Sequence, residues 1–255
     1  PVQLQAVVTG LRSRGLPGSR QDYRLAAQLK KTSGGAYALG SNLQAGSSSR
    51  PSTSLQLAGH FYTKREPLPF KFSLSSPRVS QSDIDLLMAV LAAKDSVASS
   101  PTSIAYAPRV AEPKAPRPPW ADLDGEVSIK VEELAFQSGQ VINGLKAQVK
   151  VSEALLSFKD ITATLNGGAL LGNANIAYDR IENPAYEVAS SFVVKNVDPS
   201  LFSKRTYSQF PIQGLFDGQF KFAGSGHTVE EASEDFEGDF KITGRNGVLT
   251  AFELD

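Results

Sequence analysis

The chain has 255 residues, with 26 basic and 26 acidic side chains, two histidines and no cysteine. This length allows one large domain or two modest ones. The lack of cysteine excludes disulfides, thiolate nucleophiles, iron–sulfur clusters and cysteine-bound zinc, and two histidines are too few for a three-histidine metal site. The stretch has no run of 18 apolar residues and no basic start followed by an apolar run, so it predicts neither a membrane span nor a signal peptide.

Charge is distributed unevenly along the chain. Residues 1–93 carry 11 basic and 4 acidic side chains, whereas residues 120–255 carry 11 basic and 20 acidic ones. We therefore expect the two ends to attract each other. The basic residues of the first segment are scattered among Ser and Gly with few aromatic neighbours, and this pattern is not typical of a nucleic-acid partner.

Residues 1–93 predict a strand-rich segment. Apolar residues alternate with polar ones at Tyr23, Leu25 and Ala27, and the alternation returns around residues 55–61 and 70–74, diluted by Ser, Gly and Pro. The residues Ser82-Asp83-Ile84-Asp85 are typical of a helix start, and the segment that follows to residue 93 is apolar almost all round. Such a helix needs to be buried.

Residues 94–119 predict a linker or a long surface loop. The stretch from Lys94 to Trp120 holds six of the 15 prolines of the chain. Proline has no amide donor and a fixed backbone angle, so this segment cannot join a sheet interior or a helix. We interpret it as a semi-rigid spacer, and the alternative is a ligand for an aromatic groove.

From residue 120 onward the apolar residues have a period of two. Val127, Ile129 and Val131 alternate with charged and polar residues, which places the two sets on opposite faces of a strand. Similar strands are predicted around residues 145–151, 156–165, 169–178, 185–194, 214–223, 236–243 and 247–254. Asn166-Gly167-Gly168 predicts a hairpin, because Asn and Gly tolerate positive φ, and residues 244–247 predict another tight reversal.

Two further short helices are predicted in this part of the chain. Asp198-Pro199 begins one that runs to Lys204, since proline is favoured at the first helical position. Thr228, Val229, Glu230 and Glu231 form a capping-box sequence that begins the other, which ends before Phe236.

The predicted fold class is all-β or β-dominated, a long antiparallel curled sheet with three short helices. A sheet with one apolar face must cover that face, because each buried aliphatic side chain contributes about 1.5 to 3 kcal/mol. Three short helices cover too little. The sheet must close into a sandwich or barrel, or curl into a trough whose lining is covered by a ligand, a partner or a lipid.

If the sheet is a trough, its lining is predicted from the alternation. The residues expected to line it are Val127, Ile129, Val131, Leu145, Val149, Ile161, Leu165, Ile176, Val188, Phe192, Phe220 and Phe240. Acyl chains are a suitable occupant, because their burial contributes about 0.8 kcal/mol per CH₂. The alternative is a structural or scaffold domain with a closed sandwich core and a protein partner.

Several short motifs resemble the C-terminal region of the AsmA family. The stretch from Gly125 to Tyr178 is similar to its strand-rich segment, with a small apolar residue, Asn or Gly, then Gly and an alternating strand. The later run is similar in its order of elements: a short helix at 197–202, glycines at Gly214 and Gly218, a helix capped by Gly224 to Glu231, and a closing segment from Phe236 to Leu254. The resemblance covers about half of the chain.

The resemblance implies a location and a function. Proteins of the AsmA family are anchored in the bacterial inner membrane by an N-terminal helix and extend into the periplasm as curled sheets with a hydrophobic groove. It therefore implies a groove continued by residues 1–93, a C-terminal domain at residues 120–255, phospholipid as ligand, and a role in outer-membrane assembly or lipid homeostasis. It also implies a membrane anchor outside this stretch and envelope protein partners.

Enzymatic functions are not favoured by the sequence. His60 lies in a strand pattern and His227 in a Gly-rich turn, with no Gly-x-Ser-x-Gly nucleophile motif nearby. The paired carboxylates at Glu132-Glu133 and Glu230-Glu231 are explained by turns and a helix start as well as by a glycosidase pair. A lectin would need stacking aromatics, and the single Trp lies at the edge of the linker. We expect no catalytic residues, no cofactor and no metal site.

Overall fold

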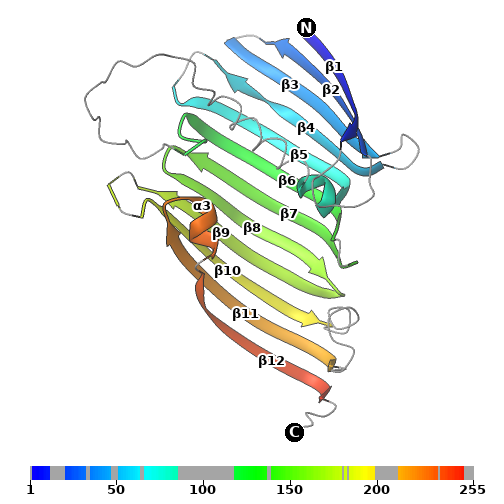
Figure 1. Ribbon diagram of the computed structural model, residues 1–255, viewed down its shortest axis with the longest axis vertical. Coiled ribbons are helices and arrows are strands. Elements are labelled where there is room, and N and C mark those ends of the chain that lie inside the picture. The colour runs from blue at the N-terminus through cyan, green and yellow to red at the C-terminus, as the bar shows by residue number, and fades with distance from the viewer. Residues whose placement is uncertain are drawn as a thin grey trace, which may run out of the picture.

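The computed structural model describes residues 2–11, 21–32, 35–46, 51–63, 66–85, 118–136, 139–179, 181–182, 184–198, 212–234 and 236–249. Their strands form one sheet of 12 strands, and the order of the strands in space is their order in the sequence (Figure 1). The prediction of a β-dominated, curled sheet is confirmed.

The strands are 10 to 15 residues long. Their bounds are β1 (Val2–Leu11), β2 (Gln21–Lys31), β3 (Ala36–Gly46), β4 (Pro51–Tyr62), β5 (Leu68–Ser80), β6 (Leu123–Ala135), β7 (Val141–Ser152), β8 (Leu155–Leu165), β9 (Gly168–Tyr178), β10 (Tyr186–Val197), β11 (Ile212–Gly226) and β12 (Glu237–Leu249). Two helical segments are described, residues 81–85 and α3 (Val229–Glu234).

One pair of strands differs from the predicted antiparallel pattern. β5 and β6 are parallel, with Leu68 opposite Leu123 and Leu74 opposite Ile129, whereas the other neighbouring pairs are antiparallel. The physical reason is the length of the connection between them. It spans residues 81–122, which is long enough for β6 to begin at the same end of the sheet as β5. Through this pair, one sheet runs across both strand-rich segments, 1–93 and 120–255; most of residues 94–119 lies outside the described residues.

The two predicted turns have different outcomes. The hairpin at Asn166-Gly167 is confirmed, with φ of 48° and 80°, between β8 and β9. The reversal at residues 244–247 is wrong, because β12 continues through it. Gly244 and Arg245 pair with Phe216 and Leu215 of β11, and the Arg245 guanidinium contacts the Asp217 carboxylate.

The Asp217 carboxylate of β11 contacts both neighbouring strands, β10 and β12. The Asn196 amide of β10 donates to its Oδ1 at 2.8 Å, and Arg245 of β12 contacts its Oδ2. The Asn196 hydrogen bond, followed by the hydrogen bond from Arg245, lowers the pKa of the Asp217 carboxyl below its usual value. Pairing along the full length of β11 therefore competes with the local turn tendency of the glycines and prevails.

The strand alternation gives the sheet two different faces. Opposite each other in β6 and β7 lie Val127 with Val149 and Ile129 with Ala147, while Glu126 lies opposite Lys150. Directly paired residues project from the same face of a sheet, so the first two pairs share one face and the charged pair lies on the other. We call these the apolar face and the polar face.

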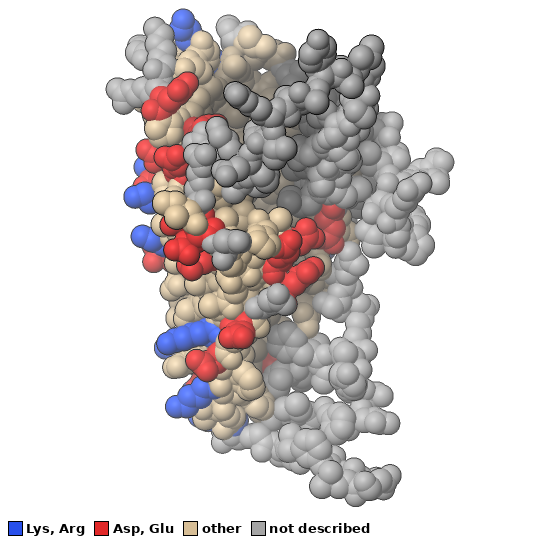
Figure 2. All heavy atoms as spheres, turned by 60° about the vertical axis from the view of Figure 1, so that its left-hand side comes forward, with Lys and Arg blue, Asp and Glu red and all other residues tan. Residues whose placement is uncertain are grey.

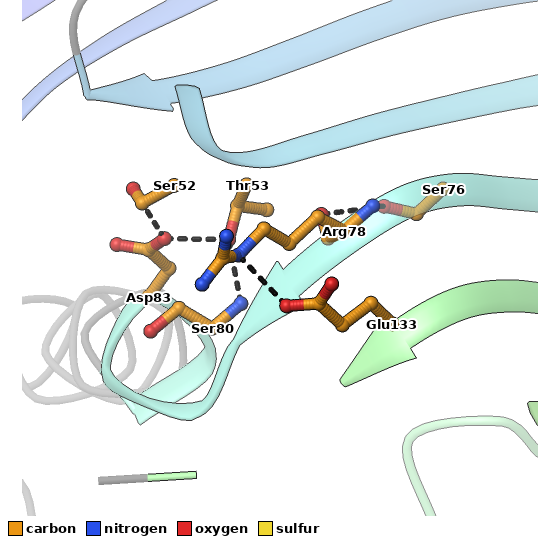
Figure 3. A network of polar contacts seen from close by, with 7 residues as sticks. All are labelled: Ser52, Thr53, Ser76, Arg78, Ser80, Asp83 and Glu133. Atoms are coloured by element: carbon orange, nitrogen blue, oxygen red, sulfur yellow. Dashed lines mark hydrogen bonds and ion pairs between the residues drawn. The ribbon is translucent and has the colours of Figure 1, made fainter. Parts of the chain in front are cut away.

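A buried carboxylate holds the helical residues 81–85 against the apolar face (Figure 3). Asp83 is 1% exposed and accepts hydrogen bonds from Thr53 Oγ1 at 2.5 Å, Ser52 Oγ at 2.9 Å and Tyr23 OH at 3.4 Å. Thr53 Oγ1 also accepts from the Ser80 amide at 2.9 Å. The start of the β5–β6 connection is thus fixed to β2 and β4 by hydroxyl groups.

Two of the three predicted helices are observed in the described residues. The predicted helix start at residues 82–85 is confirmed, although the helical residues begin at 81, and α3 confirms the capping-box prediction. The predicted helix at 199–204 lies outside the described residues.

The Tyr23–Asp83 contact generates a prediction at alkaline pH. Burial, reinforced by the charge of Asp83, raises the pKa of Tyr23 to about 12, and the side chain is 4% exposed. A phenol whose pKa is higher in the folded state than in the unfolded state makes its full contribution to stability at pH values below the unfolded-state pKa, which is near 10. That contribution is lost as the pH rises to about 12. The shift corresponds to about 2 to 3 kcal/mol.

We expect the free energy of unfolding, measured by urea titration between pH 9 and 12, to fall less steeply for Tyr23→Phe than for the wild type. All other ionisable groups are common to the two proteins and cancel in the comparison. Identical pH profiles for the two proteins would contradict the role given to Tyr23.

Candidate functional site

The apolar face brings all the predicted lining residues together. One cross-strand row joins Val127, Val149 and Phe158 through β6, β7 and β8. A second row runs from Ile161 through Phe192 and Phe220 to Phe240. The register and the two-residue alternation connect the remaining predicted residues to these rows on the same face. Whether this face binds lipid stays a prediction.

The apolar face continues into the first half of the chain, where sequence reasoning assigned no lining residue. Leu25 of β2 lies opposite Leu43, which lies opposite Leu55, and Leu57 lies opposite Leu74, which pairs with Ile129. The same rows add Leu29, Leu39, Phe61, Phe70 and Phe72, and in the second half Leu170 and Phe222. The period of two was present in these strands, but Ser and Gly at alternate places weakened it.

The described sheet leaves much of its surface accessible. The described residues form one sheet with no second layer of strands over it. Most side chains of the apolar face are half-buried, shielded by their neighbours in the sheet, while the polar face is mostly exposed.

Aromatic rings occupy the space over glycines of the neighbouring strands. A Cβ on Gly172 would lie 2.3 Å from Phe192, one on Gly238 would lie 2.7 Å from Phe222, and one on Gly125 would lie 2.7 Å from the Phe70 ring. Each glycine thus makes room for a ring on the same face. The result is a floor of aromatic and aliphatic carbon across the sheet.

Helix α3 covers the apolar face at one end of β10 and β11. Its start is a reciprocal capping box, in which the Glu231 amide donates to Thr228 Oγ1 at 3.1 Å and the His227 amide donates to Glu231 Oε2 at 2.8 Å. Ala232 is 0% exposed and packs with Tyr186 and Val188. A Cβ on Gly224 would lie 2.1 Å from the Ala232 carbonyl oxygen, so glycine is required for this close approach.

The residues just before β6 complete this cover. The Trp120 ring lies 6.3 Å from the Tyr186 ring, whose other neighbour, Tyr178, is 5.1 Å away, centroid to centroid. Strands β6 and β10 are four places apart, or about 19 Å along a sheet. Trp120 therefore reaches over the intervening strand ends on the apolar side. We call Trp120, Tyr178, Tyr186 and α3 the aromatic cap.

The capped end of the sheet is acidic. Figure 2 looks onto these strand ends, and acidic side chains gather there, while Lys and Arg project from the side of the polar face. The acidic residues at this end include Asp122, Asp179, Glu182, Glu230, Glu231 and Glu234. Burial, followed by the neighbouring Tyr178, raises the pKa of Tyr186 above its ordinary value.

The polar face carries hydrophilic side chains and a shallow hollow. A shallow hollow over β9 to β12 is lined by Asn173, Asn175, Lys221 and Asp239 among others. His60 contacts the Tyr62 ring edge-on at 5.9 Å. In the described part of the chain no three His, Asp or Glu side chains converge in a way that could hold a metal ion. None of the helices described there is long and apolar enough to span a membrane.

Comparison with known proteins gives one match. The model of the AsmA family matches residues 42–255, well over half of the chain. No curated protein and no solved structure matches the chain.

The close approach of α3 to the sheet generates a prediction about stability. Gly224→Ala would place a methyl group against the Ala232 carbonyl oxygen, which is backbone and cannot swing aside. We expect it to lower the free energy of unfolding by about 1 to 3 kcal/mol, measured by urea titration.

Gly40→Ala is the matched control, because a Cβ there meets nothing within 4 Å. It should leave the stability unchanged or raise it by about 0.4 to 1 kcal/mol. Equal losses in both variants would show that strand flexibility, and not the contact with α3, sets the requirement for glycine.

Proposed function

Because the chain belongs to the AsmA family, we propose that it is the periplasmic part of an envelope protein that binds or conducts phospholipid acyl chains along its apolar face. The observation that carries this proposal is the single open sheet with its continuous apolar face from β2 to β12. An apolar face of this extent needs an occupant, and acyl chains match its chemistry.

The energetics favour a chain-like ligand. Each CH₂ group removed from water contributes about 0.8 kcal/mol, and the floor of Val, Leu, Ile and Phe side chains makes no demand on the position of any one CH₂ group. Such contacts hold an acyl chain without fixing it at one place. Binding and conduction need no catalytic group, so we propose a non-enzymatic function without cofactor or metal.

The proposal includes a place in the cell envelope. The family is associated with the envelope, and we propose a periplasmic location, with inner-membrane anchoring by a part of the parent protein outside this stretch. The proposed outcome is outer-membrane assembly or lipid homeostasis, with envelope proteins as partners.

The alternative function, a scaffold with a closed sandwich core, needs a second sheet to close over the first. The described residues supply one sheet and no second sheet over its apolar face. A protein partner that covers the face would replace lipid in the experiment below.

A photoreactive side chain on alternate residues of β6 tests the proposal. Val127 and Ser128 are adjacent and both half-buried, and they project from opposite faces. We expect p-benzoylphenylalanine at position 127 to cross-link phospholipid in cells several-fold more than the same group at position 128. The adducts are identified by mass spectrometry after purification.

Lipid extraction and native mass spectrometry of the unmodified chain provide the second readout. Co-purified phospholipid is the expected result. Equal labelling of both faces, protein adducts at position 127 in place of lipid, or a chain free of lipid would contradict the proposal.

A further inference from the structure

Two buried hydrogen-bond donors of the aromatic cap have no acceptor among the described residues. The indole Nε1 of Trp120 and the hydroxyl of Tyr178 are both buried, and neither has a hydrogen-bond partner among the described residues. Both rings pack against Tyr186, which is 6% exposed. A buried donor left unpaired destabilises the folded state, so the two donors together favour the binding of oxygen acceptors at this place.

The position of the donors matters as much as their number. Tyr178 and Tyr186 face each other across β9 and β10 on the apolar face, next to Ile176 and Val188. Two polar hydrogens, one from Trp120 and one from Tyr178, therefore lie in the aromatic cap at the end of an otherwise apolar face. A long apolar molecule with acceptor oxygens at one end would match both the face and the donors.

The surrounding charge selects the type of acceptor. Asp122 is two residues from Trp120, Asp179 and Arg180 follow Tyr178 in the sequence, and the first turn of α3 carries Glu230 and Glu231 with no basic residue in its last turn, so the acidic residues outnumber the basic one. Neutral donors in acidic surroundings disfavour a phosphate or a free carboxylate and favour an uncharged carbonyl oxygen.

We propose that Trp120 Nε1 and Tyr178 OH bind the ester carbonyl oxygens of a diacyl lipid, with its acyl chains along the apolar face. A diacyl lipid carries two such oxygens, as many as there are unpaired donors. The aromatic cap then sets where the lipid stops along the sheet. The acidic residues at the capped end favour a zwitterionic headgroup over an anionic one. This inference rests on the proposed function.

Binding of an ester lipid and its ether analogue tests the proposal. The probes are diacyl phosphocholine and the dialkyl ether phosphocholine of equal chain length, which lacks the carbonyl oxygens. Trp120 is the only tryptophan in the chain, so its emission reports directly on the cap. We expect the ether lipid to bind about three- to tenfold more weakly, the effect of one or two neutral hydrogen bonds.

Two variants separate the donors from the rings. Tyr178→Phe keeps the ring and removes the hydroxyl, and it should reduce the preference for ester over ether lipid. Tyr37→Phe is the matched control, because Tyr37 stacks on Phe61 at 5.7 Å on the same face, in the other half of the sheet. It should keep the full preference.

A further measurement on the wild type does not depend on the folding of a variant. Lipids brominated close to the ester should quench Trp120 more strongly than lipids brominated at the chain end. Equal affinity for ester and ether lipids, or stronger quenching from the chain end, would overturn the role of the cap while leaving lipid binding intact; an enclosed water that satisfies the donors gives this result. Failure of both lipids to bind would overturn the proposed function as well.

Discussion

One constraint underlies this structure: the described residues form a sheet of 12 strands that must keep an apolar face without a second layer of strands over it. In a sandwich each sheet buries the other, and stability comes largely from the contact between layers. Within the described residues each inner strand pairs with two neighbours and each edge strand with one, and the only further covers are short ones at the strand ends. Side chains on the apolar face consequently shield one another, and the curl of the sheet keeps most of them half-buried.

The glycines follow from this constraint. In a sheet with a single layer, the bulk of a Phe ring has to lie against the sheet itself, and a glycine on the next strand supplies the space, as at Gly172 beneath Phe192 and Gly238 beneath Phe222. Gly224 serves the same purpose for α3. Gly218 also belongs to the short motifs that resemble the AsmA family, and there a Cβ would lie 2.7 Å from the Phe220 ring. At Gly218 the motif thus coincides with a place of close packing.

Much of the fold and the floor of the site can be predicted from the sequence, because the pleat converts a period of two directly into two faces. Even the step from Phe158 to Ile161, which breaks the alternation, corresponds to an irregularity in β8 where Asp160 has φ of 52°. Three features could not be predicted. The parallel β5–β6 pair depends on the path of a long connection, and residues 244–247 have turn chemistry that pairing with β11 overrides. The Trp120–Tyr186 contact joins residues far apart in sequence, and it depends on the curl of the sheet, which no local pattern encodes.

The floor and the cap solve different physical problems for a chain-like ligand. Contacts with CH₂ groups are nearly alike at every position along the floor, so they supply affinity and leave the ligand free to slide. A hydrogen bond has a fixed direction and a short range, so a few donors at one end are enough to define a stopping point. Within the described residues, Trp120 and Tyr178 are two of only three residues with a buried side-chain polar atom that lacks a partner, and the third, Asn42, lies in the first half of the sheet. On the proposed function, contacts along the whole apolar face therefore supply the affinity, while hydrogen bonds in the aromatic cap fix the position of the lipid. A lipid can thus be retained at one end without being held tightly along the rest.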